Sequence, residues 1–219
     1  MTGSTERLTS IEGDIARAAR VARRDPATVT LVAVSKRRSA AEIEPLIAAG
    51  ARHFGESRVQ EAGDKWPALR AAHLGLTLHM IGRLQSNKAA DAVALFDVIH
   101  SLDRHSLLDA LVAAAAQADK FPTCFVQVNI GDEDQKGGVA IGDLPALLDR
   151  VRASPLPLAG LMAIPPQGPD PAPYFALLAD LARRHGVTGL SIGMSADFEA
   201  AVMLGATVVR VGSALFDGQ

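Results

Sequence analysis

The sequence predicts an α/β protein, a single TIM-type (β/α)8 barrel, and three observations carry this prediction. Eight short apolar runs have the length and composition of buried strands. Segments with helical spacing of apolar residues alternate with these runs, which is typical of a parallel sheet. Eight such units within 219 residues, with no linker between them, favour a closed barrel over an open sheet.

The first predicted element is an amphipathic helix over residues 5–24, whose apolar face includes Leu8, Ile11 and Ile15. Its arginines are expected to form a solvated face. The predicted strands that follow are 29–34, 52–55, 76–81, 97–102, 123–130, 156–162, 188–192 and 207–211. The predicted helices after them are 39–50, 56–71, 86–95, 103–118, 144–151, 174–185 and 196–204.

Residues 212–219, after the last predicted strand, are too few for an outer helix. We therefore expect the N-terminal helix to cover that gap in the ring of helices. Residues 1–219 are interpreted as one barrel domain, with residues 1–25 as an extra helix packed on it. This interpretation predicts that deleting the helix lowers the thermal stability of the barrel.

The composition argues against several classes of protein. A formal net charge of −2 gives no electrostatic reason to expect nucleic acid or an anionic membrane as a partner. No apolar run approaches the roughly 18 residues of a membrane span, and the N-terminal residues lack the apolar core of a secretory signal. Cys124 is the only cysteine, and the histidines lack metal-ligand spacing, so we expect neither a disulfide nor a metal site. Cytoplasm is the expected compartment.

Lys36 stands directly after the first predicted strand, 29–34. The carboxyl ends of the strands are where α/β barrels bind ligands. A lysine whose stem lies in a dry rim loses its proton more easily, because desolvation disfavours the charged form. Such an amine can form a Schiff base with an aldehyde. The alternative is a solvated lysine that opens a basic loop, because Arg37 and Arg38 follow it.

Two turns rich in small residues follow the last two predicted strands, and they contain Met194-Ser195 and Gly212-Ser213. Barrels often bind phosphate in these two loops, where backbone N–H groups can approach an anion closely. Ser195 can instead be a plain helix N-cap. A phosphate clamp opposite a strand-end lysine indicates a phosphorylated aldehyde, and pyridoxal 5′-phosphate (PLP) fits that description.

Several motifs in one order cover nearly the whole chain. The most distinctive are Leu84-Gln85-Ser86-Asn87-Lys88 and Gly193-Met194-Ser195-Ala196-Asp197, and the others lie at residues 31–36, 54–61, 79–82, 101–104, 127–130, 160–165 and 209–216. With these motifs the sequence resembles the pyridoxal phosphate homeostasis protein family, whose fold is that of the alanine racemase N-terminal barrel.

The resemblance implies that Lys36 holds PLP as an internal aldimine. It places Arg210 beside the pyridine nitrogen, where an arginine keeps that nitrogen unprotonated and weakens the ring as an electron sink. The remaining implied contacts are Ser195, Gly212 and Ser213 to the phosphate, and Ser57, Met194 and Ile81 elsewhere on the cofactor.

The sequence departs from the family pattern near this site. Ser57 and Arg58 stand where an asparagine and an aromatic residue are usual, Arg83 replaces a usual proline, and Asp217 a common glycine. None of these departures touches the lysine or the phosphate motif. We therefore expect PLP binding to persist, with an affinity that the sequence does not fix.

The resemblance implies a monomeric carrier that takes part in intracellular PLP homeostasis and delivers the cofactor to apo PLP-dependent enzymes, without robust catalysis of its own. A racemase-like enzyme is the alternative. Racemisation needs two acid/base groups on opposite faces of the cofactor, and in alanine racemase the second is a tyrosine from an additional domain. The only tyrosine here, Tyr174, begins a predicted outer helix and is interpreted as a packing residue.

A second alternative is a phosphate-sugar barrel enzyme without PLP. In it, Lys36 and Glu56 would be the acid/base partners. Glu56 also has a simpler interpretation as a favourable charge near a helix N-terminus. Lys136, in the glycine-flanked loop after the fifth predicted strand, is interpreted as a solvated loop lysine that could also meet an incoming anion.

Overall fold

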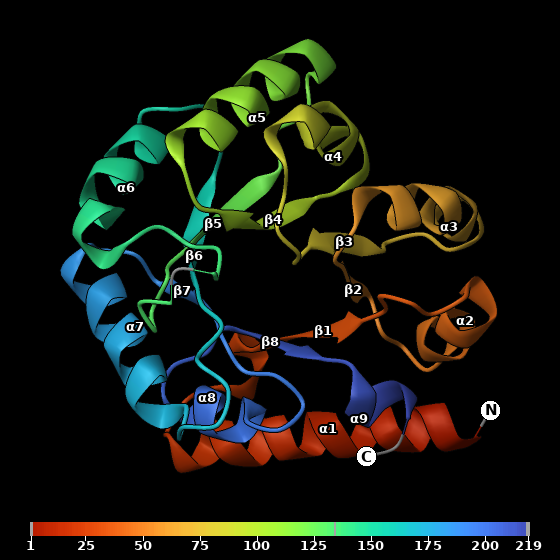
Figure 1. Cartoon of the computed structure of the whole chain (residues 1–219). Helices are drawn as coiled ribbons and strands as arrows, with labels where there is room; N and C mark the ends of the chain where they lie inside the picture. The colour runs from red at the N-terminus through yellow and green to blue at the C-terminus, as the bar shows by residue number, and fades with distance from the viewer. Residues whose placement is uncertain (1, 134, 218–219) are drawn as a thin grey trace.

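The eight strands close into a parallel barrel in sequence order, because β8 pairs with β1 (Figure 1). The structure is a computed structural model that describes residues 2–133 and 135–217. The helices lie around the outside of the barrel (Figure 1). The predicted fold class, a TIM-type (β/α)8 barrel with an extra N-terminal helix, is confirmed.

The elements follow one another in the predicted order, with shifts at several ends. The strands are Thr30–Val34 (β1), His53–Glu56 (β2), Thr77–Met80 (β3), Val98–Leu102 (β4), Thr123–Gln127 (β5), Leu158–Met162 (β6), Gly189–Ser191 (β7) and Val208–Val211 (β8). The helices are Thr2–Val21 (α1), Ala40–Ala48 (α2), Val59–Ala72 (α3), Ala89–Leu95 (α4), His105–Ala118 (α5), Leu144–Arg152 (α6), Ala172–Arg184 (α7), Phe198–Met203 (α8) and Ser213–Phe216 (α9).

Local signals set the start and end of α2. Ser39 is its N-cap, and the Glu42 carboxylate accepts hydrogen bonds from the Ser39 backbone N–H and hydroxyl, both at 2.8 Å. The backbone hydrogen bond is the main reason why the pKa of Glu42 falls to about 2. Gly50, two residues after the helix, has a φ of +113°, a conformation that favours glycine.

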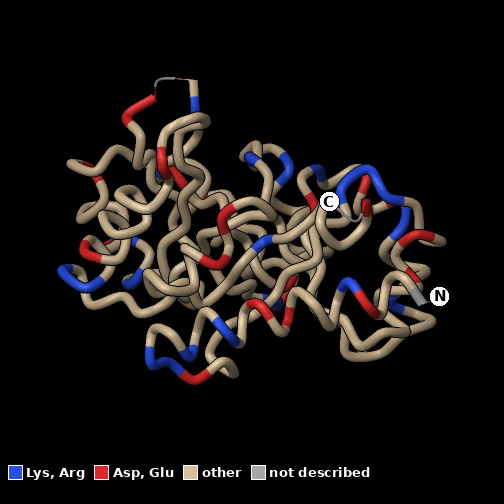
Figure 2. Tube along the Cα trace, turned by 90° about the horizontal axis from the view of Figure 1, so that it is seen from below, with Lys and Arg blue, Asp and Glu red and all other residues tan. Residues whose placement is uncertain are grey.

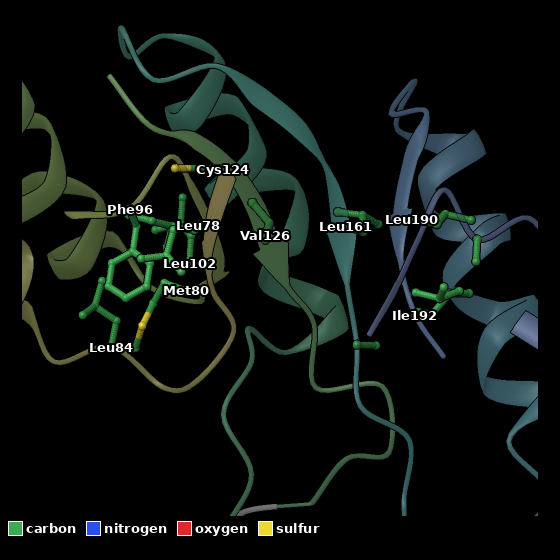
Figure 3. Packing of buried hydrophobic residues seen from close by; sticks show 14 of the residues in the cluster. Leu78, Met80, Leu84, Phe96, Leu102, Cys124, Val126, Leu161, Leu190 and Ile192 are labelled. Atoms are coloured by element: carbon green, nitrogen blue, oxygen red, sulfur yellow. The ribbon is translucent and has the colours of Figure 1, made fainter. Parts of the chain in front are cut away.

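The outer face of the barrel wall packs against the helices. Side chains alternate between the two faces of a strand, and the outward ones are almost all apolar. Figure 3 shows Leu78, Met80, Phe96 and Leu102 gathered together, and all four belong to the large apolar cluster. Further outward residues of the same cluster are Val126, Leu161, Leu190, Ile192, Val209 and Val211. Burial of this continuous apolar layer is what holds the helices on the barrel.

The inner face of the wall has a different composition. A separate, small apolar cluster is formed by Val32, Phe125, Met162 and Val208, from β1, β5, β6 and β8. Polar side chains lie at other inward positions, each next to at least one outward apolar residue. His79, His100, Ser191 and Arg210 are all buried in this way.

The N-terminal helix α1 packs against α8, α9 and α2, beside the end of the chain (Figure 1). Leu8, Ile11 and Ile15 are buried in this contact. The expectation that its arginines form one solvated face is wrong in part. Arg24 donates to the carbonyls of Val202 (2.7 Å) and Ala206 (2.8 Å), and Arg7 donates to the carbonyl of Leu215 (2.6 Å). These arginines hydrogen-bond backbone carbonyls in and after α8 and in α9.

Charged residues of both signs are interspersed along the trace (Figure 2). Within the ranges that the structure describes, none of the helices combines the length and the apolar character needed to cross a bilayer.

Candidate functional site

A cavity of about 670 Å³ lies at the carboxyl ends of the strands. All eight residues that the sequence singles out as PLP contacts line it, namely Lys36, Ser57, Ile81, Met194, Ser195, Arg210, Gly212 and Ser213. They come from β8 and from the segments that follow β1, β2, β3, β7 and β8. Five separate segments of the chain therefore meet at one place. The contacts of these residues to a cofactor remain predictions.

Lys36 lies at the mouth of this cavity and is exposed to solvent. The expectation of a lysine held in a dry rim is therefore wrong for this structure. The loop that carries Lys36 is nevertheless fixed, because Lys65 from α3 donates to the carbonyls of Ser35 (2.9 Å) and Arg38 (3.0 Å) on either side of it. The amine thus stands on an anchored backbone while remaining open to solvent.

The turns after β7 and β8 are joined by a hydrogen bond from the Gly212 N–H to the Ser195 hydroxyl, at 3.2 Å. The turn after β7 requires a glycine at its first position, since Gly193 has a φ of +92° and an added Cβ would lie 2.6 Å from the Cβ of Ala201. The N-cap interpretation of Ser195 is wrong. Helix α8 begins at Phe198 with Asp197 at its N-cap position, so the Ser195 hydroxyl is not used by the helix.

Arg210 reaches the cavity from the inner face of β8 and is only 4% exposed. Its guanidinium donates to the carbonyl and hydroxyl of Ser191, both at 2.6 Å, and to the carbonyl of Ala163 at 3.1 Å. Burial lowers its pKa to about 10, and the charge of Asp197 opposes this effect. Arg210 therefore remains a cation at neutral pH, held by neutral oxygens.

Glu56 lies away from the cavity. It is the last residue of β2 rather than part of a helix start, and it is fully buried. Its carboxylate accepts from Ser35 Oγ (2.6 Å) and Trp66 Nε1 (3.0 Å) and pairs with Lys65 Nζ (2.9 Å). Both sequence interpretations of Glu56 are wrong, because the strand extends one residue further than predicted. It cannot act as the acid/base partner of Lys36 in this arrangement.

Three residues at or near strand ends, Ser101, Met162 and Asn129, do not line the cavity. Ser101 and Met162 lie inside strands, and Asn129 bonds with the backbone of Glu133 within its own loop. Gln127 and Ile164 line the cavity in their place, because β5 ends earlier than predicted and the loop after β6 turns inward.

Lys136 also lines the cavity and is only partly exposed. Its amine pairs with Glu133 at 2.6 Å and donates to the carbonyl of Pro165 at 3.0 Å. The interpretation of Lys136 as a freely solvated loop lysine is therefore wrong. It ties the loop after β5 to the loop after β6 at the edge of the cavity.

Sequence reasoning missed three histidines inside the barrel. His53, His79 and His100 stand in line, and the last of them hydrogen-bonds Ser191, the partner of Arg210. Each of them lies on a strand next to an outward apolar residue. A polar residue that alternates with apolar ones along a strand predicts an inward polar side chain, and this pattern could have identified them. Across the described ranges, no three His, Cys, Asp or Glu side chains are grouped as a metal site would need.

The cavity fits a PLP-sized ligand in chemistry as well as in volume. Arg210 is a buried cation at its inner end whose hydrogen bonds, among the described residues, go to neutral oxygens. Burying a cation without a counter-ion is costly, so such a group suits a ligand with an anionic or acceptor atom. Val34, Ile81 and Ile164 offer apolar surface to a flat ring, and Lys36 offers an amine.

Comparison with known proteins identifies the family. The sequence profile of the alanine racemase N-terminal domain matches residues 7–219. A pyridoxal phosphate homeostasis protein of Pseudomonas aeruginosa is 41% identical over 99% of this chain and 96% of its own length. The chain belongs to the pyridoxal phosphate homeostasis protein family. A member of this family from Escherichia coli K12 is 36% identical over 99% of this chain and 97% of its own length.

Solved structures agree with this family assignment. PipY of Synechococcus elongatus, solved with PLP bound, superposes with a TM-score of 0.85 at 38% identity, over 97% of this chain and 99% of PipY. Alanine racemase of Clostridium difficile gives a TM-score of 0.74 at 12% identity, over 98% of this chain but 56% of that enzyme. The second similarity concerns the fold alone. It shows that this chain matches little more than half of the racemase.

Proposed function

We propose that this chain binds PLP in the cavity at the carboxyl ends of its strands and acts as a PLP carrier in cofactor homeostasis. The observation that carries the proposal is the convergence of Lys36, Arg210 and the two turns after β7 and β8 on one cavity. The family to which the chain belongs, and the PLP-bound structure of PipY, support it.

The residues that line the cavity would contact different parts of the cofactor. When bound, PLP supplies an aldehyde that a lysine amine can capture reversibly as a Schiff base. Lys36 is the amine at the mouth, and Ser195, Gly212 and Ser213 supply hydroxyl and N–H donors for the phosphate. Arg210 presents a cation to the ring nitrogen from inside the barrel, with Ser57, Ile81 and Met194 against the rest of the cofactor. Because Lys36 is exposed, an amine from solvent can reach it.

A carrier is favoured over a racemase by what surrounds the cavity. Racemisation needs a second acid/base group on the opposite face of the cofactor. Tyr174 lies on α7, packed against the outer apolar cluster, and is not among the residues that line the cavity. We infer that such a carrier passes the cofactor to apo PLP-dependent enzymes.

The binding proposal is tested by adding PLP to the purified protein and recording its visible absorption. Wild type is expected to develop a visible band that Lys36→Ala lacks. Borohydride reduction followed by mass spectrometry should place a pyridoxyl adduct on Lys36. Lys120→Ala, which removes a lysine outside the cavity, is the matched control and should behave like wild type. An adduct on another lysine, or none, would refute the proposed site.

Delivery is tested separately with loaded protein and an apo PLP-dependent enzyme, in the presence of a phosphatase that destroys free PLP. Protected transfer should restore the enzyme's activity to a greater extent than the same amount of free PLP does. Turnover of amino acids in a racemisation assay by the loaded protein alone would instead support the enzyme alternative.

A further inference from the structure

A continuous chain of hydrogen bonds crosses the inside of the barrel from Arg210 to the amino ends of the strands. Arg210 Nη1 lies 2.6 Å from Ser191 Oγ, which lies 2.8 Å from His100 Nδ1. His100 Nε2 lies 2.9 Å from His79 Nδ1, and His79 Nε2 lies 3.1 Å from His53 Nδ1. These groups come from β8, β7, β4, β3 and β2, so the chain connects five of the eight strands.

The donors and acceptors along this chain can be assigned from Arg210 outward. A guanidinium has only donors, so the Ser191 oxygen must accept from Arg210. The Ser191 hydroxyl can then donate its own hydrogen bond to His100 Nδ1. An imidazole that accepts at Nδ1 and is neutral carries its proton on Nε2, so His100 donates to His79, and His79 donates to His53 by the same rule. Every bond in the chain therefore points away from Arg210.

The surroundings keep these histidines neutral. Burial lowers the pKa of His79 to about 3, with a smaller effect from His53. Burial lowers the pKa of His100 well below its ordinary value, and His79 and Arg210 add to this. Phe125 covers the His100 ring, with the ring centroids 4.6 Å apart. His53 is half-buried at the amino end of β2 and shares a cavity of about 280 Å³ with Glu12 and Arg52.

We propose that Ser191, His100, His79 and His53 form a positioning relay for Arg210, which rests on the proposed function. His100 accepts the hydrogen bond of the Ser191 hydroxyl, and this fixes the hydroxyl rotor so that an oxygen lone pair faces Arg210. The guanidinium is then fixed by Ser191 and Ala163 where it lines the cavity, so that under the proposed function it would be held in place for the ring nitrogen of PLP. The neutral histidines leave Arg210 as the only cation of the chain, so the ring nitrogen meets a donor of constant charge across the neutral pH range.

The first experiment needs no cofactor. Nitrogen-15 NMR of histidine-labelled protein reports the tautomer of each ring. We expect His79 and His100 to carry their protons on Nε2 and to keep them there, uncharged, from pH 8 to pH 5. In Ser191→Ala, His100 should lose this single tautomer, because no donor faces its Nδ1. A protonated Nδ1 on His100 in wild type, or a charged His79 or His100 above pH 5, would overturn the relay.

The second experiment measures PLP. Loss of a hydrogen bond to a charged group should weaken PLP binding by Ser191→Ala about tenfold and shift the position of the visible band, because Arg210 is no longer held in one place. Ser191→Thr keeps the hydroxyl and should restore both properties. Ser101→Ala removes another buried serine hydroxyl, on β4, which has no hydrogen-bond partner among the described residues, and should match wild type.

The outcomes separate the relay from the proposed function. If Ser191→Ala binds PLP like wild type with an unchanged band, the chain only fills the barrel and the relay is wrong. If wild type takes up no PLP at all, the proposed function fails, while the tautomers measured without cofactor still decide whether the donors point away from Arg210.

Discussion

The outer and inner faces of the same barrel wall are built for different purposes. The outer face carries one large apolar cluster that packs against the helices, and the buried Glu56 network is a polar exception on this face. The inner face carries a small apolar cluster and a polar chain that ends at Arg210 in the cavity. Successive side chains of a strand point to opposite faces, so a step of one residue along the strand leads from one environment to the other. The comparison teaches that stability and ligand recognition use alternate residues of the same strands.

The largest expected effect that tests this comparison is a loss of stability in acid that comes from the inner face. The ordinary pKa of histidine, about 6.5, applies to the unfolded chain, whereas burial lowers the pKa of His79 to about 3 and that of His100 well below the ordinary value. Above pH 6.5 both residues are mostly neutral in the folded and in the unfolded chain, so the free energy of unfolding does not depend on them there. Below pH 6.5 the unfolded chain binds protons that the folded chain does not.

The free energy of unfolding should therefore fall as pH decreases from 6.5, by about 3 kcal/mol at pH 4.5 from His79 alone, and His100 should add to this loss. Urea unfolding at pH 7.5, 6.5, 5.5 and 4.5 measures this. His105→Ala, which removes an exposed histidine, should leave the profile unchanged. A stability that stays constant down to the range where carboxylates titrate would show that the inner histidines are charged in the folded protein.

The next effect comes from the outer face. Leu161 on β6 is fully buried between the wall and the helices (Figure 3). Leu161→Ala should lower the free energy of unfolding by about 3 kcal/mol, from lost apolar burial and the cavity left behind. PLP affinity of the folded fraction should not change. Leu161→Met, which conserves volume, should cost less than about 1.5 kcal/mol. An altered PLP affinity in Leu161→Ala would contradict the separation of the two faces.

The smallest expected effect concerns the contact between the segment after α1 and helix α8. Arg24 donates to the carbonyls of Val202 and Ala206, at and beyond the end of α8. Arg24→Ala should lower the free energy of unfolding by about 1 to 2 kcal/mol, because a charged donor to two carbonyls is lost. Arg24→Lys, which can keep one of these bonds, should lose less. Equal stability of wild type and Arg24→Ala in thermal unfolding would show that this contact does not hold α1 in place.

The fold could be predicted because each of its elements depends on a pattern of neighbouring residues. Alternation of apolar runs and helical spacings is a property of neighbouring residues, and so are the capping box at Ser39 and the glycine after α2. The cavity was predictable for a related reason. Parallel strands bring all their carboxyl ends to one rim, so residues such as Lys36, Ser195 and Gly212 meet once the strand ends are known.

Other features depended on details that a local pattern does not fix. A boundary wrong by one residue placed Glu56 outside its strand and hid its buried network with Trp66 and Lys65. The histidine chain joins residues 53, 79, 100 and 191, whose spacing along the sequence has no period. Only closure of the barrel brings them together. The solvent exposure of Lys36 depends on how far neighbouring loops extend, which the sequence does not show.

The solvent exposure of Lys36 bears on the rate at which a bound cofactor could be exchanged under the proposed function. An acceptor amine can approach from bulk water while the surrounding loops stay where they are, since Lys65 clamps the backbone on both sides of the lysine. If the proposed carrier function holds, the loops that the structure describes would not need to move before exchange begins. The lifetime of the loaded protein should then depend on the concentration of competing amines rather than on a slow internal motion.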